Sequence, residues 1–405
     1  AITLLNVHKD GQGKKGFKRP VLFPKIVFLY DKELHGDGSD KYPSADVFNA
    51  GIDCSAKTMY PDWLSLTGDG YVAEMYKKYK KVVSPMGCRA FLSPWYERGG
   101  MHPADENDTP IFKGRFNLGV VSLHLPMILA KARRESKDFY EVLDYYLELV
   151  RGLHKRTYDY IGELHASVNP VAFCEGGFLG GHLNPDDKIK SILPPMTMSY
   201  GITALNELQR LYNGKSIRED GQFVLEVMQY INDYTNRIKE EDHILYAIYG
   251  TPAESLCGLQ VEQFRKIYGI VENVSDRPYV SNSFHCHVSE DMSPIEKQDK
   301  EGRFWDLFNG GKIQYCRYNL GYNEEAIKTL ILRAMKKGFY EGVNLAMCYC
   351  EDCGYQQVEM TICPKCGSTL IIEIDRMNGY LGFTRVHGET RYNEAKNAEI
   401  ADRVS

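Results

Sequence analysis

The stretch that decides the fold lies near the carboxyl end: CEDCGYQQVEMTICPKCGSTLIIEIDRMNGYLGF, Cys350 to Phe383. It contains two Cys-x-x-Cys pairs and then a short apolar run that leads to Gly379, which stands among polar and bulky neighbours. A glycine in such a place has two interpretations. It can serve a turn that needs a positive φ, or its Cα–H bond can itself take part in chemistry. The sequence around it decides between the two.

The cysteine spacing predicts a metal site. The ligands would be two pairs, Cys350 with Cys353 and Cys363 with Cys366. Each pair can present two thiolates from one tight turn, and the residues between the pairs have the length and β content of a hairpin arm. Four thiolates in a tetrahedron favour zinc over iron, and a closed site of this kind is structural. Cys348 is a spare thiol with a less suitable Cys-x-Cys spacing.

A zinc ribbon of this kind has two common uses. It can bind nucleic acid, or it can fix a segment that would otherwise move. The formal net charge of −5 and the absence of a basic stripe with interleaved aromatic residues argue against direct nucleic-acid binding. We therefore expect the ribbon to hold the segment that follows it, which contains Gly379.

Length and composition indicate an ordinary globular protein. The 405 residues suffice for one large domain or two, and hydrophobic residues make up 43% of them. No apolar run is long enough to cross a bilayer, and the amino end lacks the features of a signal peptide. Clustering of five of the eleven cysteines suits a reducing cytoplasm, or a host cytoplasm for a viral protein. Because the chain begins with Ala1, we expect a processed chain or part of a longer one.

Hydrophobic periodicity predicts strands that alternate with helices. We expect an exposed lead-in at 1–20, a buried strand within 20–34, and a strand, tight loop and strand over 81–95. Helices are predicted at 119–165 (as two), 199–212, 222–240, 253–268, 323–338 and the carboxyl end, with short β segments at 277–288 and 310–320. This alternation favours an α/β barrel or a wound sheet.

Several stretches together resemble one family. RMNGYLG (376–382), placed after a four-cysteine ribbon, resembles the glycyl-radical segment of anaerobic (class III) ribonucleoside-triphosphate reductases. SPMGCRAFL (84–92) resembles the finger loop of that family, which carries the thiyl-forming cysteine. Weaker similarities follow in the family's order: GRFNLGVVSLHLP from Gly114, TPAESL from Thr251, YVSNSFHCHV from Tyr279 and GGKIQY from Gly310. The resemblance extends from about Arg19 to the carboxyl end.

The resemblance implies an architecture. It implies an α/β fold of the ten-stranded glycyl-radical-enzyme barrel type, of which residues 1–340 would form a portion that includes the finger loop. A zinc ribbon would occupy 341–372, and a glycyl-radical loop with a terminal helix would occupy 373–405. Family members are longer at the amino end, where an ATP cone, the region for ATP and deoxynucleotide effectors and early barrel strands lie. We find none of these, so we expect a carboxyl-terminal portion that needs a separate amino-terminal polypeptide or behaves poorly alone.

The resemblance also implies radical chemistry. An iron–sulfur activating protein that uses S-adenosylmethionine would remove a hydrogen atom from Gly379. The resulting glycyl radical would take hydrogen from the Cys88 thiol, and the thiyl would attack a bound ribonucleoside triphosphate. Formate would supply the reducing equivalents, and a homodimer is expected. A second active-site cysteine normally comes from the amino-terminal part of family members, and Cys54 is a candidate for it by residue type alone.

Two groups of residues are candidates for substrate contact. Asn117 matches a family asparagine near substrate and formate, although it could instead cap a helix that begins at Leu118. The substrate-binding candidates in TPAESL are Thr251, Ala253, Glu254 and Ser255. Backbone amides at a helix start bind phosphate well, and the alternative is a helix cap with proline in the first turn.

Histidines are expected to be structural. His285 and His287 alternate in a strand-like run, which favours satisfied core residues over a metal site. His124 stands where the family commonly has asparagine, so its role is left open. Two other functions also stay open: a glycyl-radical enzyme of the formate-lyase or dehydratase type, and a zinc-ribbon binding protein without chemistry. The ribbon before the glycine argues against the first, and an electron-resonance doublet would exclude the second.

Overall fold

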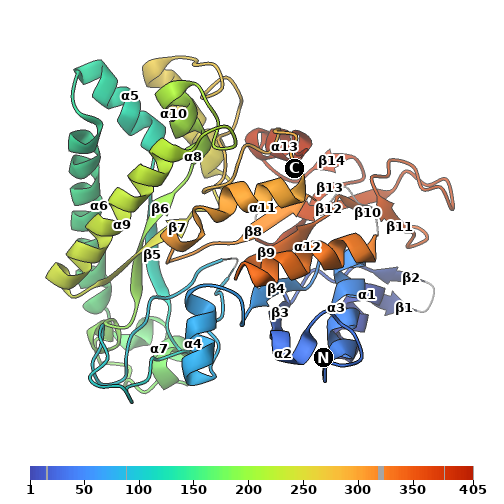
Figure 1. Cartoon of the computed structure of the whole chain (residues 1–405), viewed down its shortest axis with the longest axis horizontal. Helices are drawn as coiled ribbons and strands as arrows, with labels where there is room; N and C mark the ends of the chain where they lie inside the picture. The colour runs from blue at the N-terminus through green and yellow to red at the C-terminus, as the bar shows by residue number, and fades with distance from the viewer. Residues whose placement is uncertain (15–16, 88, 318–322, 378, 405) are drawn as a thin grey trace.

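The computed structural model describes residues 1–14, 17–87, 89–317, 323–377 and 379–404 of the chain (Figure 1). Its strands are β1 Gln12–Lys14, β2 Phe17–Arg19, β3 Val27–Tyr30, β4 Asp62–Ser65, β5 Asn117–Leu123, β6 Thr197–Ile202, β7 Leu245–Gly250, β8 Gln314–Arg317, β9 Tyr340–Asn344, β10 Met347–Cys350, β11 Gln356–Val358, β12 Ile371–Arg376, β13 Leu381–Val386 and β14 Glu389–Thr390. Its α-helices are α1 Ile2–Asp10, α2 Lys32–His35, α3 Ala45–Thr58, α4 Tyr71–Tyr79, α5 Leu125–Glu135, α6 Phe139–Gly162, α7 Pro170–Phe173, α8 Leu205–Asn213, α9 Gln222–Asp242, α10 Leu256–Tyr268, α11 Pro294–Gly302, α12 Glu324–Lys336 and α13 Glu394–Ala401.

A parallel sheet of β5, β6 and β7 forms one half of the molecule. Pairs of helices connect its strands, α5 and α6 after β5, and α8 and α9 after β6, and they stand together on one side of the sheet in Figure 1. Every residue of β6 is buried, as expected for a strand covered on both faces. The connections place the carboxyl ends of all three strands at the same edge of the sheet.

A mixed sheet in the order β3-β4-β9-β8 forms the other half. β3 and β4 are parallel, as are β8 and β9, while β4 and β9 run antiparallel. Gly311, just before β8, forms bridges with Tyr249 of β7 and with Ala90, so this segment links the two halves. α3 and α12 pack on the mixed sheet.

A third sheet, all antiparallel, contains the carboxyl-terminal residues in the order β11-β10-β12-β13-β14. α13 then returns to α10, and the approach is close. A Cβ added at Gly258 of α10 would lie 2.5 Å from the Cβ of Ala395. α13 is therefore packed against the rest of the protein.

The α/β class predicted from the sequence is confirmed, and several details differ. The helix predicted at 199–212 begins instead as β6, which pairs with β5 and β7, and becomes helical only in α8. The described residues of 81–95 form isolated bridges and not the two predicted strands. The sheets do not close into a barrel over the residues that the structure covers. The amino end is not an exposed lead-in, because α1 packs against α3 and buries Leu5 and His8. The run predicted as two helices from 119 begins instead inside β5, whose paired valines favour a strand. Residues 277–288 form turns without a strand, because their backbone is held by contacts such as those of Ser281 with Glu207.

Helices 222–240 and 323–338, predicted from periodicity, are present as α9 and α12. Within the described ranges, no helix is both long and apolar enough to cross a membrane.

Candidate functional site

Gly379 lies at the tip of the hairpin that β12 and β13 form. The ladder ends with Arg376 opposite Leu381, and the Met377 amide donates to the Tyr380 carbonyl at 2.8 Å. This hydrogen bond closes the turn. Gly379 itself is buried, so the tip of the hairpin points into the protein and not into solvent.

Two cationic side chains donate to the Gly379 carbonyl oxygen. Lys25 Nζ lies 2.7 Å from it and Arg376 Nη1 lies 3.3 Å from it. Both cations also contact Asp62, whose Oδ2 is 2.8 Å from Lys25 Nζ and whose Oδ1 is 2.8 Å from Arg376 Nη2. Asp62 and Arg376 are fully buried and the Lys25 side chain is 8% exposed, so these interactions lie where water screens them little.

This charged group was missed from the sequence. Its signal was present, because Lys25 and Asp62 are single charges inside the apolar runs FPKIVFLY and YPDWLSL. Burial opposes a charged guanidinium, but neighbouring Asp62 leaves the pKa of Arg376 above its ordinary value. The Leu381 amide donates to the Tyr60 hydroxyl at 3.4 Å, and burial raises the pKa of Tyr60 to about 12. The hydroxyl is therefore neutral near pH 7.

A third buried cation, Arg403, holds the first strand of the hairpin. Arg403, which follows α13, donates to Asp375 Oδ1 at 2.8 Å and to the carbonyls of Arg376 and Met377 at 2.6 and 3.2 Å. It also forms an ion pair with Glu399 at 2.9 Å. Burial alone would raise the pKa of Glu399, but its two cationic neighbours hold it at about 2. The end of the chain thus fixes the hairpin that carries Gly379.

The finger loop lies beside this tip. Cys88 falls outside the described residues, so its position rests on its neighbours. Met86 and Ala90 exchange backbone hydrogen bonds of 2.7 and 3.0 Å, so these two residues stand opposite each other. Gly87 has a φ of +54°, and a Cβ added to it would lie 3.2 Å from the hydroxyl of Tyr380. The residue next to Cys88 therefore contacts the residue next to Gly379.

Arg89 connects the finger loop to the parallel sheet. It is fully buried, and its Nη1 donates to the Gly250 carbonyl at 3.2 Å and to Asn282 Oδ1 at 3.3 Å. Gly250 is the last residue of β7 and precedes Thr251. The finger loop is thus adjacent both to the glycine hairpin and to the strand end where the TPAESL segment starts.

Asn117 is the first residue of β5. Its side-chain amide donates to Ser199 Oγ at 2.5 Å, and its Oδ1 accepts from the Gly119 amide at 2.9 Å. The next helix, α5, begins only at Leu125. The alternative role of Asn117 as a helix N-cap is therefore wrong, and the side chain is instead held across two strands.

The TPAESL segment lies at the carboxyl ends of the parallel strands, the edge at which open α/β sheets bind ligands. Thr251 Oγ1 is 2.9 Å from Ser122 Oγ, and Ala253 is buried with a φ of +54°. α10 begins at Leu256, so proline is not in its first turn, and Ser255 forms no side-chain cap. Glu254 and Ser255 are exposed. The arrangement leaves the start of a 13-residue helix facing this edge.

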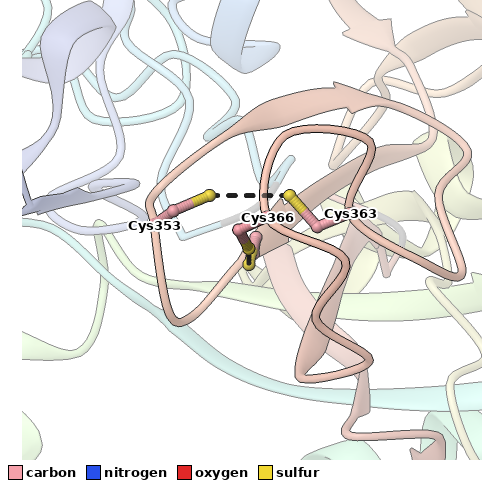
Figure 2. Close-up of side chains that lie close together, drawn as sticks. Cys353, Cys363 and Cys366 are labelled. Carbon is pink, nitrogen blue, oxygen red and sulfur yellow. Dashed lines mark hydrogen bonds between the residues drawn. The ribbon is translucent and has the colours of Figure 1, made fainter.

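The four predicted cysteine ligands come together (Figure 2). Their sulfur atoms all lie within 4.8 Å of one another, with Cys350 and Cys366 3.5 Å apart and Cys353 and Cys363 3.5 Å apart. Zinc–sulfur bonds of about 2.3 Å in a tetrahedron separate the sulfurs by about 3.8 Å. The residues present therefore fit a tetrahedral zinc ion. Cys348 is not part of this cluster, and its sulfur accepts from the Met360 amide at 3.3 Å.

The remaining candidates from the sequence, one cysteine and two histidines, are buried. Cys54 is buried in α3 beside Thr58, and burial raises the pKa of its thiol to about 11. His285 Nδ1 is hydrogen-bonded to buried Glu301 at 2.8 Å, and His287 contacts Ser289. In the part of the chain that the structure describes, only the four-cysteine cluster groups ligands for a metal. The buried Nε2 of His285 has no hydrogen-bond partner among the described residues, so the expected role of satisfied core residues stays a prediction.

Comparisons with known proteins identify the family of this chain. A family model for the anaerobic ribonucleoside-triphosphate reductase matches residues 2–405. Similar curated proteins include the reductase of that name from Haemophilus influenzae, 31% identical over 96% of this chain and 54% of that protein, and the one from Escherichia coli, 30% identical over 99% and 56%. The enzyme of this name from Enterobacteria phage T4 is 30% identical over 99% of this chain and 64% of that protein. The chain therefore spans about half the length of the bacterial relatives.

Solved structures show the same fold. One described as an anaerobic ribonucleotide reductase matches with a TM-score of 0.67 and 16% identity, over 99% of this chain and 56% of that chain. The anaerobic ribonucleotide reductase from Thermotoga maritima with glycerol in the active site matches with a TM-score of 0.64, over 94% of this chain and 54% of that chain. At this level of identity the likeness concerns the fold alone.

Proposed function

Because the chain belongs to the anaerobic ribonucleoside-triphosphate reductase family, we propose that it carries the radical-bearing part of such an enzyme. The reaction would reduce ribonucleoside triphosphates to 2′-deoxyribonucleoside triphosphates without oxygen. Formate would supply the two reducing electrons, and the 2′-hydroxyl would leave as water. The finer assignments of residues that follow are part of this proposal.

One observation carries the proposal: the tip of the glycine hairpin, where Gly379 is buried, lies against the finger loop at the exposed Gly87. Gly379 is buried at the turn, and Tyr380, the next residue, lies against Gly87. A glycine needed only for chain reversal has no reason to lie there, because turns are normally exposed. Burial limits contact with solvent, which protects a stored carbon radical from competing reactions.

Each proposed radical step transfers one hydrogen atom. The activating protein, an iron–sulfur enzyme that uses S-adenosylmethionine, would take the hydrogen atom of the Gly379 Cα–H bond. Gly379 would then regain a hydrogen atom from the Cys88 thiol, which becomes a thiyl. The thiyl would take the 3′-hydrogen of the substrate and return it after reduction. The glycine suits this task because no side chain blocks a planar Cα.

The triphosphate of the substrate would bind at the edge where the parallel strands end, and the rest of the substrate would extend along the sheet toward Asn117 at the amino-terminal end of β5. Asn117, held by Ser199, would face the sugar and formate. The amides at the start of α10, together with Thr251 and Ser255, would bind the triphosphate. The backbone at Ala253 is left-handed, and Glu254 is exposed beside it.

The four-cysteine cluster would hold a structural zinc ion that fixes the segment 341–372 next to the radical segment 373–405. Residues 1–340 would contribute the catalytic portion of a ten-stranded barrel, whose remaining strands and effector region would come from an amino-terminal portion like that of the longer relatives. A homodimer is part of the same proposal. A formate-lyase or dehydratase type of enzyme fits less well, since the chain matches the reductase model throughout.

The test is anaerobic activation. The activating protein with S-adenosylmethionine should give an electron-resonance doublet, from one hydrogen on the Gly379 radical, and exposure to air should then cleave the chain at Gly379. Gly379→Ala should give neither result while keeping zinc. Gly388→Ala is a matched control, because Gly388 lies in the neighbouring β-turn with open space around it and a φ of +84°. Alanine should cost about 1 kcal/mol of stability there, but the doublet and the cleavage should match the wild type. A doublet in Gly379→Ala would contradict the proposal.

A further inference from the structure

We propose that Lys25 and Arg376 are positioning residues that stabilise a radical on Gly379 through its carbonyl oxygen, with Asp62 holding both cations in place. This inference rests on the proposed function, because it assumes that Gly379 stores the radical. It adds to it a pair of side chains that the sequence resemblance does not assign.

The position of Lys25 is specific. Its Nζ lies 2.7 Å from the Gly379 oxygen and 2.8 Å from Asp62 Oδ2. The same ammonium group lies 5.2 Å from the centres of both the Tyr340 and the Tyr380 rings. Two ring faces and one carboxylate thus surround the cation and aim it at the carbonyl, as expected for a cation–π arrangement. Its side chain is 8% exposed.

Arg376 approaches the same oxygen from its own strand. Its Nη1 is 3.3 Å from the Gly379 oxygen, while Nη2 binds Asp62 and also donates to the Val343 carbonyl at 2.9 Å. The guanidinium is fully buried. Tyr340 adds a hydrogen bond from its hydroxyl to Asp62 Oδ2 at 3.1 Å. The carboxylate therefore sits between the two cations and fixes their relative positions.

The hairpin does not need these charges in order to turn. The Met377–Tyr380 hydrogen bond already closes it, and an uncharged backbone carbonyl needs only one neutral donor. Burying two cations and a carboxylate is costly, and such groups often give less stability than apolar residues of the same size. Arg376 also donates to the carbonyls of Met59 and Val343 and so serves the fold. A second charge-assisted donor on the Gly379 carbonyl, from Lys25, is better explained by a demand of the chemistry.

That demand follows from the electronic structure of the radical. When the Cα hydrogen leaves, the unpaired electron is shared between Cα, the amide nitrogen and the carbonyl group. The nitrogen supplies electron density and the carbonyl withdraws it. Cationic donors at the oxygen strengthen this withdrawal in a low-dielectric site. Lys25 and Arg376 keep their protons throughout, so only the hydrogen atom on Cα moves.

Isotope labelling of the wild-type protein tests the contact directly. We expect pulsed electron resonance on activated protein with nitrogen-15-labelled lysine to show a coupling from the Lys25 side chain. In heavy water, exchangeable deuterons should be found next to the carbonyl oxygen. A radical without any lysine coupling would overturn the inference while the proposed function stands. If no radical forms at all, the proposed function itself fails, and this inference fails with it.

Substitutions give a second readout. Lys25→Met should lower the radical yield at equilibrium by about tenfold, the size expected for one charge-assisted hydrogen bond, and should shift its g-values. Lys25→Arg should restore much of both. Lys9→Met is the control, because Lys9 also pairs with an aspartate, Asp53, but in a part-exposed place outside the site, and it should match the wild type. The inference would be contradicted if Lys25→Met folds, binds zinc and still gives the radical yield and g-values of the wild type. If that variant does not fold, the labelling result decides.

Discussion

The two ends of the carboxyl-terminal sheet are held by different means. At β10 and β11, four cysteines are close enough to share one metal ion, and Cys366 is exposed. At β12 and β13, the chain is fixed to the rest of the protein by buried ion pairs of Arg376 and Arg403. The sheet is continuous between these ends, since β12 pairs with both β10 and β13.

The two ends can therefore serve different purposes, one structural and one chemical. A metal ion can fix a small segment that has too little core of its own. Charged side chains can in addition place an electric field at a chosen atom, here the Gly379 carbonyl oxygen. We therefore expect loss of metal to loosen the cysteine end first, and loss of the buried charges to affect the glycine end first.

The largest effect is expected for Asp62→Asn. It removes the carboxylate that Lys25 and Arg376 share, and breaking a buried ion pair costs about 3–5 kcal/mol. The free energy of unfolding from a urea titration measures this. Asp53→Asn, in the part-exposed pair with Lys9, should cost about 1 kcal/mol or less. Equal losses in the two variants would show that the buried group does not fix the hairpin.

Removal of the metal should sharpen the contrast between the two ends. A chelator should increase hydrogen exchange strongly in residues 347–358 and around the four cysteines, because the thiolates then repel one another. The amides of β12 and β13 should keep more of their protection, since Arg376 and Arg403 still hold them. Hydrogen exchange with mass spectrometry measures both regions. Uniform loss of protection across 347–386 would mean that the metal holds the whole sheet.

Acid should release the glycine end instead. The folded pKa of Glu399 is about 2, below the ordinary value of 4.5. The stability it contributes is complete above pH 4.5 and is lost as the pH falls toward 2. Exchange in residues 394–404 should therefore rise over this interval. Glu399→Gln should remove most of this pH dependence, and an unchanged profile in that variant would assign it to other carboxylates.

The smallest effect is expected at a turn of the cysteine cluster. Gly367 has a φ of +73° with open space around it, so an added methyl group meets no atom and only the backbone conformation is strained. Gly367→Ala should cost about 1 kcal/mol and weaken zinc binding slightly. A competition titration with a chromogenic chelator measures this. A loss of more than about tenfold in zinc affinity would show that the turn does more than free the backbone.

The features that the sequence predicted correctly depend on residues that are close together in the chain. The spacing of the cysteines predicted their cluster, and strong periodicity predicted α9 and α12. β5 was hidden because its valines run directly into the apolar face of α5. The charged group around Gly379 could not be predicted, since residues 25, 62 and 376 meet only through the pairing of β3 with β4 and the fold of the last hairpin. Single charges in apolar runs were its one signal.

Disulfide trapping tests the central claim most directly, namely that position 88 lies within reach of position 379. A disulfide needs Cα atoms about 4.4–6.8 Å apart, close to the separation that hydrogen transfer demands. In Gly379→Cys, mild oxidation followed by peptide mapping should join the peptide containing Cys88 to the peptide containing residue 379. The double variant Gly379→Cys/Cys88→Ser should not form this link. The opposite result would be a Gly379→Cys variant that folds and binds zinc but whose Cys88 can still be fully alkylated after oxidation. That result would contradict the account.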